Sequence, residues 1–367
     1  MKLRAPRDPF LQQLQLAAAF CPTRSPRPIF QDVLVEADEG LVTLTATDGE
    51  VSIRTRCRTE GVSGQGTAAI PATTLLSAVR ALPTEVVEIE EKGAFHEVSG
   101  GSALFKLHCD DAEQYPAIHG LDEAGTTVDV PAGPFLDLCS RTMFAAAKDM
   151  GRYAFHGVLL ELDPKEITLV ATDGRRLSMA RLEIATGVKA RHSSIVPVRG
   201  LSQLQRAVPD REGRLSITAR DDQVRFAVED TEIVVQIVEG EFPDFRAVLP
   251  KKQDTPKEVE LDRHEFASAI QRAAVTAGEE ARAVELRFDK GTLAVLSRQE
   301  GVGEARSEMG IAYQGDAVGI RFNPEFLGEY LKTLPEGALK FRFKDRASAG
   351  LFSSSDDALY VVMPITS

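Results

Sequence analysis

The sequence has few of the features that mark secreted, zinc-stabilised or membrane-spanning proteins. Its 367 residues include four cysteines, and no two of them have the Cys-x-x-Cys spacing of a zinc knuckle or a redox motif. This use of cysteine is typical of a reducing compartment and predicts free thiols without a disulfide framework. No apolar run approaches the ~20 residues needed to cross a bilayer, and no signal-type apolar segment follows the first residues. We therefore expect a cytoplasmic protein without a membrane partner.

The chain also lacks an excess of basic charge. It has 43 Lys and Arg against 55 Asp and Glu, a formal net charge of -12. This balance argues against a protein that grips nucleic acid over its whole surface, but not against one that confines its basic groups to a single face. The apolar fraction of 43% is ordinary for a globular protein. The length predicts two or three domains, at ~100–200 residues each.

One stretch of sequence occurs twice in the chain. When Arg27–Gly49 is shifted by 125 positions it falls on Arg152–Gly174, and 12 of the 23 positions are identical. Both copies end in Thr-Asp-Gly between alternating apolar residues, a pattern that predicts a hairpin turn with a positive φ at Gly. The chain is therefore built from repeated structural units.

The two copies differ after the turn. The apolar phase continues at Val51 and Ile53 in the first copy, but at Leu177 and Met179 in the second. We therefore expect one extra residue, Arg175 or Arg176, in the second loop, where an altered loop could serve a function.

Six segments have the spacing of short amphipathic helices, and each begins at a capping residue or a proline. They recur every 60 to 66 residues and begin near Asp8, Pro71, Pro131, Pro197, Asp262 and Asn323. Between them the apolar residues alternate with a period of two, which predicts antiparallel strands with one buried face. The sequence thus predicts an α+β fold of three pseudo-repeated domains, each with two helices packed on antiparallel sheets. The expected domains are residues 1–124, 125–251 and 252–367.

Four segments carry a resemblance to a known family. They are Arg152–Glu161, the loop Ala171–Leu177, Glu241–Pro250 and the terminal strand Tyr360–Pro364. With the three pseudo-repeats, they make the chain resemble the bacterial sliding clamps, the beta subunits of DNA polymerase III, over essentially its whole length. The resemblance implies a DNA-clamp fold and a head-to-tail homodimer that closes six domains around duplex DNA. It also implies a processivity factor that has no catalysis of its own, no cofactor and no metal.

The same resemblance implies a peptide-binding pocket between the second and third domains. Leu177, Val248, Val361 and Met363 would supply an apolar floor, and Arg176 would fix the polar or acidic end of a partner. The expected partners are the polymerase III alpha subunit, the clamp loader and repair polymerases, each through a short segment with Gln, then Leu, then Phe. The full predicted pocket is Phe155, Thr172, Gly174, Arg175, Arg176, Leu177, Pro243, Val248, Ser348, Val361 and Met363.

Candidate residues for DNA contact and for subunit contact complete the implied sites. Arg24, Tyr153, Arg199 and Arg246 match positions where family members touch DNA, and Arg80 and Arg206 lie on the polar faces of predicted helices. Few phosphate contacts would favour sequence-independent sliding. At the subunit interface the resemblance implies Phe105 and Leu107 on one edge strand, opposite Val275 and Thr276.

Other interpretations of the sequence are an enzyme and a clamp paralogue. An enzyme could use Asp48 and Asp173 as paired carboxylates, but no catalytic constellation accompanies them. The segment His108–Asp111 has metal-ligand residue types without partners at useful spacing, and Glu300–Glu304 has the pattern of a hairpin turn. A paralogue that binds peptides without a replicative role is the alternative, since Arg175 stands where family members commonly carry His.

Overall fold

A computed structural model describes residues 1–38, 40–93, 95–119, 124–148, 153–208, 211–278, 283–355 and 357–366, without the side chains of Ser63, Tyr153, Ala154 and Lys252. The chain forms two compact units. Unit 1 contains residues 1–133 and 199–237, and unit 2 contains residues 134–198 and 238–367.

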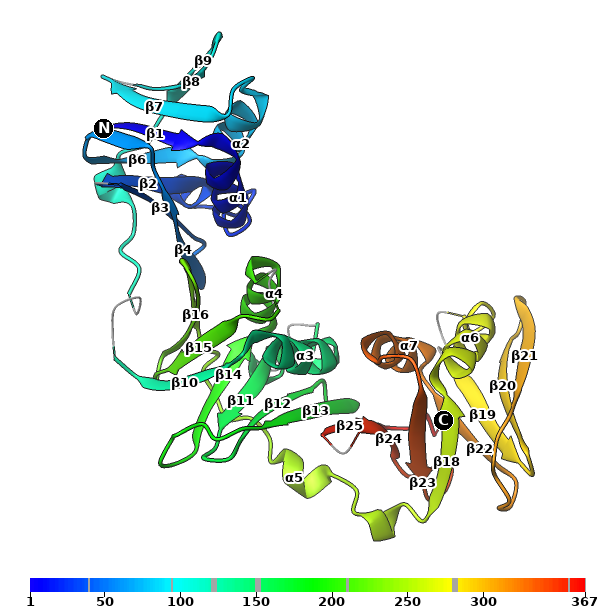
Figure 1. Cartoon of the computed structure of the whole chain (residues 1–367). Helices are drawn as coiled ribbons and strands as arrows, with labels where there is room; N and C mark the ends of the chain where they lie inside the picture. The colour runs from blue at the N-terminus through cyan, green and yellow to red at the C-terminus, as the bar shows by residue number, and fades with distance from the viewer. Residues whose placement is uncertain are drawn as a thin grey trace. The chain divides into compact units, whose positions relative to one another are not determined.

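Unit 1 is built on two antiparallel sheets (Figure 1). The five-stranded sheet has the order β5 (Gly61–Gly64), β1 (Lys2–Pro6), β7 (Val86–Lys92), β8 (Phe95–Gly100) and β9 (Ala103–His108). The eight-stranded sheet has the order β10 (Thr126–Pro131), β15 (Arg214–Ala219), β16 (Gln223–Val228), β17 (Thr231–Gln236), β4 (Val51–Arg58), β3 (Leu41–Thr47), β2 (Asp32–Asp38) and β6 (Gly66–Pro71). Helices α1 (Arg7–Ala18) and α2 (Ala72–Ala81) pack on each other, and α1 also packs against β3 and β4. Helix α4 (Val198–Ala207) contributes all but its first residue to this unit.

Unit 2 has the same plan. Its eight-stranded sheet has the order β14 (His192–Pro197), β11 (Gly157–Leu162), β12 (Glu166–Thr172), β13 (Arg176–Glu183), β25 (Ala358–Val362), β24 (Gly350–Ser355), β23 (Ala338–Phe343) and β18 (Lys257–Asp262). Its four-stranded sheet has the order β21 (Gly303–Gly310), β20 (Thr292–Gln299), β19 (Val284–Asp289) and β22 (Val318–Phe322). Helices α6 (Arg263–Ala274) and α7 (Pro324–Thr333) pack on each other, and most of α3 (Ala132–Thr142) also belongs to this unit.

All six predicted helices are present at the predicted places. The residue before the helix acts as the cap of α6 and of α7: Asp262 accepts the backbone N–H of Glu265 (2.8 Å), and Asn323 accepts that of Glu325 (2.9 Å). These contacts satisfy donors that the first helical turn would leave unpaired. A seventh short helix, α5 (Phe245–Val248), was not predicted from the sequence.

An aromatic core holds the second half of unit 2 together. Phe341 stacks on Phe352 with ring centroids 4.3 Å apart, and Tyr330 stacks on Tyr360 at 4.5 Å. These rings are almost fully buried between α6, α7 and the two sheets. Large buried rings contribute much apolar area, so this cluster is a main source of stability in the unit.

The two units do not follow the predicted domain boundaries, because each eight-stranded sheet joins two sequence-distant halves. In unit 1, β17 pairs with β4 from Thr231 to Val235, and in unit 2, β13 pairs with β25 from Arg176 to Ala180. The hydrogen bonds of these ladders divide the expected central domain between the units. The structure thus groups the strands differently from the sequence repeats, and the domain boundaries at 124/125 and 251/252 stay a prediction.

Candidate functional site

The two Thr-Asp-Gly sequences form the same turn. Asp48 Oδ1 accepts the N–H groups of Glu50 (2.9 Å) and Val51 (2.8 Å), and Asp173 Oδ1 accepts those of Arg175 (2.9 Å) and Arg176 (3.0 Å). The glycines have φ of 97° (Gly49) and 84° (Gly174), where a side chain is disfavoured. Both aspartates are therefore turn-forming residues, and each carboxylate is bound by backbone N–H groups of its own turn.

The second turn contains no extra residue, contrary to our expectation. Thr47 pairs with Ser52 across the first turn, and Thr172 pairs with Leu177 across the second, so the two loops have equal length. The apolar phase changes because Arg176 takes the place of Val51. Both side chains are buried, with 4% and 1% of their surface exposed. In the second copy the apolar side chain is consequently that of the next residue, Leu177, which points to the opposite face of the sheet.

A cavity of about 220 Å³ lies on that opposite face in unit 2. It brings together ten of the eleven predicted pocket residues: Phe155, Thr172, Gly174, Arg175, Arg176, Leu177, Pro243, Val248, Val361 and Met363. Ser348 does not line the cavity, although the adjacent Ala349 does. The Ser348 hydroxyl instead donates to Asp345 Oδ1 (2.9 Å) and closes its own turn.

The floor of the cavity is an apolar cluster on the sheet. Leu177 on β13 and Val361 on β25 are a cross-strand pair, and both are buried. The cluster also includes Leu159, Val170, Ile195, Phe245 and Leu351. At the rim, Val248 is 63% exposed and Met363 is 50% exposed. Large apolar side chains exposed beside an apolar cavity are typical of a ligand or partner site.

Three lining residues were missed in the sequence: Asp244, Phe245 and Ala349. The first two lie inside the Glu241–Pro250 segment that carried the family resemblance, and the short helix α5 turns Phe245 into the apolar cluster. A helix of four residues has no periodic signal that a sequence pattern could reveal.

Arg176 does not have the role that we expected for it. Its guanidinium donates to Asp173 Oδ2 (3.0 Å), Glu329 Oε2 (2.5 Å) and the Phe144 carbonyl (2.7 Å), and it stacks over the Phe326 ring at 4.2 Å. These contacts hold the guanidinium within unit 2. Arg176 therefore stabilises the turn, and its charge is already neutralised by carboxylates of the same unit.

The carboxylate of Glu329 is the main partner of that buried arginine. Burial acts to raise the pKa of Glu329, but hydrogen bonds from Lys148 and Arg176 outweigh burial and lower the pKa below its ordinary value. The group is therefore ionised at neutral pH and neutralises Arg176, which ties α7 to the turn beneath the cavity.

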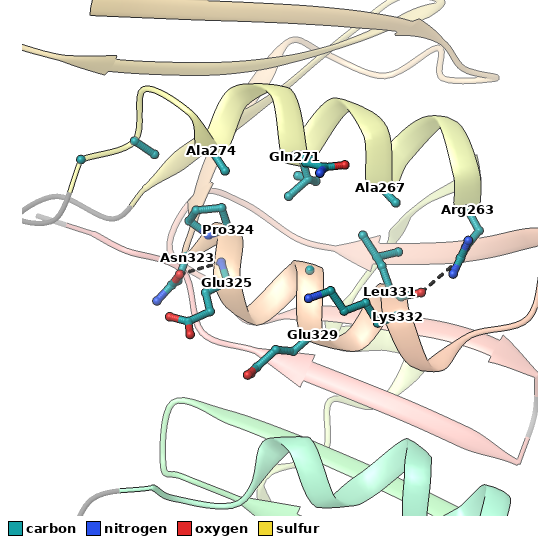
Figure 2. Close-up of a pocket in the computed structure, with 14 residues that line it drawn as sticks. Arg263, Ala267, Gln271, Ala274, Asn323, Pro324, Glu325, Glu329, Leu331 and Lys332 are labelled. Carbon is teal, nitrogen blue, oxygen red and sulfur yellow. Dashed lines mark hydrogen bonds between the residues drawn. The ribbon is translucent and has the colours of Figure 1, made fainter. Parts of the chain in front are cut away.

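A second cavity, of about 600 Å³, lies between α6 and α7 (Figure 2). In Figure 2 Arg263 reaches across to the Leu331 carbonyl, a contact of 3.1 Å, at the opposite end from the Asn323 cap. Glu329 lines this groove as well as binding Arg176. Five of the fourteen lining residues are Ala or Gly, whose small size leaves space between the two helices.

The predicted DNA-contact residues fall into two groups. Arg24, Arg80 and Arg206 are exposed in unit 1. Arg199 is paired with Asp48, and Arg246 donates to both oxygens of the buried Glu161 carboxylate. The side chain of Tyr153 lies outside the described part of the chain. The exposed members remain candidates for phosphate contact, whereas Arg199 and Arg246 have carboxylate partners in their own units.

The predicted subunit-contact residues lie at sheet edges and helix ends. Strand β9 is the edge of the five-stranded sheet, with Phe105 half-buried and Leu107 buried against its own unit (7% exposed). Val275, at the end of α6, is 79% exposed, and Thr276 is hydrogen-bonded to Ser297 Oγ (2.6 Å). The most exposed apolar side chain of β9 is Leu104 (52%), which the sequence analysis did not single out.

The remaining candidates have structural roles. Among the described residues, no three His, Cys, Asp or Glu side chains converge as a metal site. Asp111 caps a short turn by accepting the N–H of Glu113 (3.0 Å), and residues 300–302 form the turn between β20 and β21. In the part of the chain that the structure describes, no helix is both long and apolar enough to cross a membrane.

Comparison with known proteins gives consistent matches over the whole chain. Family models described as the N-terminal, central and C-terminal domains of the DNA polymerase III beta subunit match residues 1–119, 129–244 and 246–366. The beta sliding clamp of Pseudomonas aeruginosa is 29% identical over 364 residues, which cover 98% of each chain. That of Vibrio cholerae is 28% identical over 368 residues, which cover 100% of each chain.

Solved structures agree with these matches. A crystal structure of DNA polymerase III subunit beta from Pseudomonas aeruginosa has a TM-score of 0.94 at 28% identity and covers 100% of both chains. The sliding clamp of the same organism bound to griselimycin has a TM-score of 0.95 at 28% identity, again over 100% of both chains. Fold and matches together define a DNA sliding clamp for replication, a class of processivity factor without catalysis of its own. The chain belongs to the bacterial DNA polymerase III beta subunit family.

Proposed function

We propose that two copies of this chain associate head to tail, close around duplex DNA, and hold their partners through the cavity of unit 2. The partners are the polymerase III alpha subunit, the clamp loader and repair polymerases. Each inserts a short segment with Gln, then Leu, then Phe, so that these proteins compete for one site.

Two sheet edges support the head-to-tail association. Strand β9 ends the sheet of unit 1, and β21 ends the four-stranded sheet of unit 2. An edge strand presents unpaired backbone groups and is an aggregation hazard unless another strand covers it. The exposed side chains of β9 include Leu104 and Lys106, and those of β21 include Glu304, Arg306 and Glu308, so each edge offers charged groups to a facing strand. Pairing β9 of one copy with β21 of the next removes both free edges.

The cavity in unit 2 is the single observation that supports partner binding most strongly. It combines a buried apolar floor with two exposed apolar side chains, Val248 and Met363. Apolar side chains that serve only the core would be buried, so this exposure indicates a binding surface. An aliphatic or aromatic anchor of a partner segment would bury both side chains. The relative from Pseudomonas aeruginosa that binds griselimycin indicates that clamps of this fold accept ligands.

The test is a titration of a fluorescent peptide that contains Gln, Leu and Phe in that order. Val248→Glu and Met363→Glu place a charge at exposed rim positions, so the fold should survive, and each should weaken binding at least about tenfold. Ser52→Glu is the control, because it adds the same negative charge beside the equivalent turn of unit 1, which does not line the cavity. Equal affinity of the rim variants and wild type, with unchanged thermal unfolding, would contradict a binding role for this cavity.

A further inference from the structure

Two opposite charges at the rim of the cavity have no partner within the described part of the chain. Arg175 lies in the turn between β12 and β13, Asp244 lies just before α5, and both are exposed lining residues. Among the described residues, no hydrogen bond or ion pair involves the Arg175 guanidinium, and the Asp244 carboxylate does not cap its own helix. The two side chains also form no ion pair with each other.

The neighbouring charges differ in this respect. Arg176 is neutralised by Asp173 and Glu329, and Arg246 is neutralised by Glu161. The charge of Arg175 is therefore not used to stabilise the fold of unit 2. It stands beside an apolar cavity that a partner side chain would fill.

An ion pair at this place would be stronger than one on an open surface. Filling the cavity with an apolar anchor excludes water from the rim, which lowers the local dielectric and strengthens charge–charge contacts there. A guanidinium also offers parallel N–H donors that match both oxygens of a carboxylate. The arrangement of rim charges fits a partner segment that carries an acidic residue beside its apolar anchor.

We propose that Arg175 selects, among the short partner segments, those with a carboxylate next to the apolar anchor. Asp244 acts in the opposite sense and disfavours a carboxylate on its own side of the cavity, so that the two charges fix the direction of the segment. This inference rests on the proposed function of the cavity and adds the chemical class of segment that it prefers.

The experiment uses three short peptides that hold Gln, Leu and Phe in that order and differ only at the position before Leu, which is Asp, Asn or Lys. Wild-type protein should bind the Asp peptide about threefold more tightly than the Asn peptide, and the Lys peptide least tightly, at low ionic strength. Arg175→Gln should abolish the difference between Asp and Asn. Arg175→Glu should reverse the order, and salt should reduce the preference in wild type.

Two further variants complete the test. Asp244→Asn should raise the affinity for the Asp peptide, because it removes a negative charge from the rim. Lys290→Gln is the matched control: it makes the same charge change as Arg175→Gln on the exposed turn between β19 and β20, and should leave the Asp preference intact.

The possible results separate this inference from the function on which it rests. If no peptide binds any protein, the proposed function and the charge preference both fail. If all three peptides bind wild type equally, the cavity is a binding site but Arg175 does not select for charge. If Arg175→Gln leaves the peptide order unchanged and weakens retention on DNA instead, Arg175 contacts phosphate and the inference is overturned.

Discussion

Arg176 and Val51 occupy the same position of two repeated turns, but their side chains have different roles. Val51 packs as an apolar core residue, whereas Arg176 is held by two carboxylates, a carbonyl and two aromatic rings. Replacing an apolar core residue with arginine is tolerated here because the charge is paired and each guanidinium nitrogen donates a hydrogen bond. The next residue of the strand, Leu177, is apolar and lines the cavity.

Removal of the Arg176 guanidinium should be strongly destabilising. Arg176→Met removes the donor to the Phe144 carbonyl and one of the two cations that Glu329 binds, Arg176 and Lys148. We therefore expect a loss of about 3 kcal/mol in the free energy of unfolding. Urea denaturation measures it. The control Arg175→Met, at an exposed side chain, should change stability by less than about 0.5 kcal/mol. Similar losses in both variants would contradict the structural role of Arg176.

Asp32 predicts a pH dependence in unit 1. It begins β2 and is 3% exposed. Burial, and then the neighbouring Asp110 carboxylate, raise the pKa of Asp32 to about 7. Because the folded pKa lies above the unfolded value, the contribution of Asp32 to stability is complete below about pH 4 and is lost as the pH rises toward 7.

The substitution Asp32→Asn should remove this dependence. The amide is neutral at every pH and can donate to Asp110, so the variant should unfold at a higher temperature than wild type at about pH 8 and lose the slope between about pH 4 and pH 7. Calorimetry over that range measures the unfolding of the whole chain. The exposed Asp129→Asn should keep the wild-type slope, and a slope that persists in Asp32→Asn would show that another group titrates.

Helices and turns follow from local chemistry in this chain. Prolines, Asp262 and Asn323 mark helix starts, and Thr-Asp-Gly marks turns whose side chains bond their own backbone. The equal geometry of the two turns allows one to serve as a control for the other, since only the second lines the cavity.

Gly49→Ala and Gly174→Ala should have similar costs in stability and different effects on binding. Both glycines have positive φ, so each substitution should cost about 1 kcal/mol. A Cβ at Gly49 would lie 3.4 Å from the Phe30 ring, and one at Gly174 would lie 3.8 Å from the Phe155 ring. Peptide titration of both variants should reveal weaker binding in Gly174→Ala alone. Loss of affinity in Gly49→Ala would place the binding site elsewhere.

The proposed ring requires association through surfaces that belong to different units. Leu104 on β9 and Val275 at the end of α6 are largely exposed, although both are apolar. In the proposed ring, a second copy covers these surfaces. The protein would then hold DNA by enclosing it, and would need few direct contacts to phosphate.

Charges at these surfaces should separate the copies. Wild type should have a mass of about 80 kDa in light scattering, twice the 39.9 kDa of the chain, and Leu104→Asp with Val275→Asp should shift it toward the single chain. Wild type should also stay on nicked circular DNA and slide off linear DNA, and the double variant should be retained on neither. Lys290→Glu is the control for added negative charge. A double variant that remains a dimer would contradict this interface.

Most of the local structure and most of the cavity could be predicted from the sequence. Helix starts, hairpins and the repeat depend on short-range patterns, and ten cavity residues were identified because their motifs match a family. Phe245 was missed because a four-residue helix has no period, and Ser348 was misplaced because its turn directs the hydroxyl to Asp345. The prediction of an extra residue in the second loop was wrong, because a change in the apolar phase can result from a buried arginine as well as from an insertion.

The sequence by itself determined the six helices, the antiparallel strands and the two Thr-Asp-Gly turns, since capping, alternation and turn hydrogen bonds act between residues close in the chain. Only the tertiary structure decided that β17 joins β4 and that β13 joins β25, because strand edges pair according to which faces are buried together. It also decided which charged side chains have a partner of opposite charge. Arg176 meets Glu329 from a helix 153 residues away, whereas the adjacent Arg175 meets no described carboxylate and is left at the rim of the cavity.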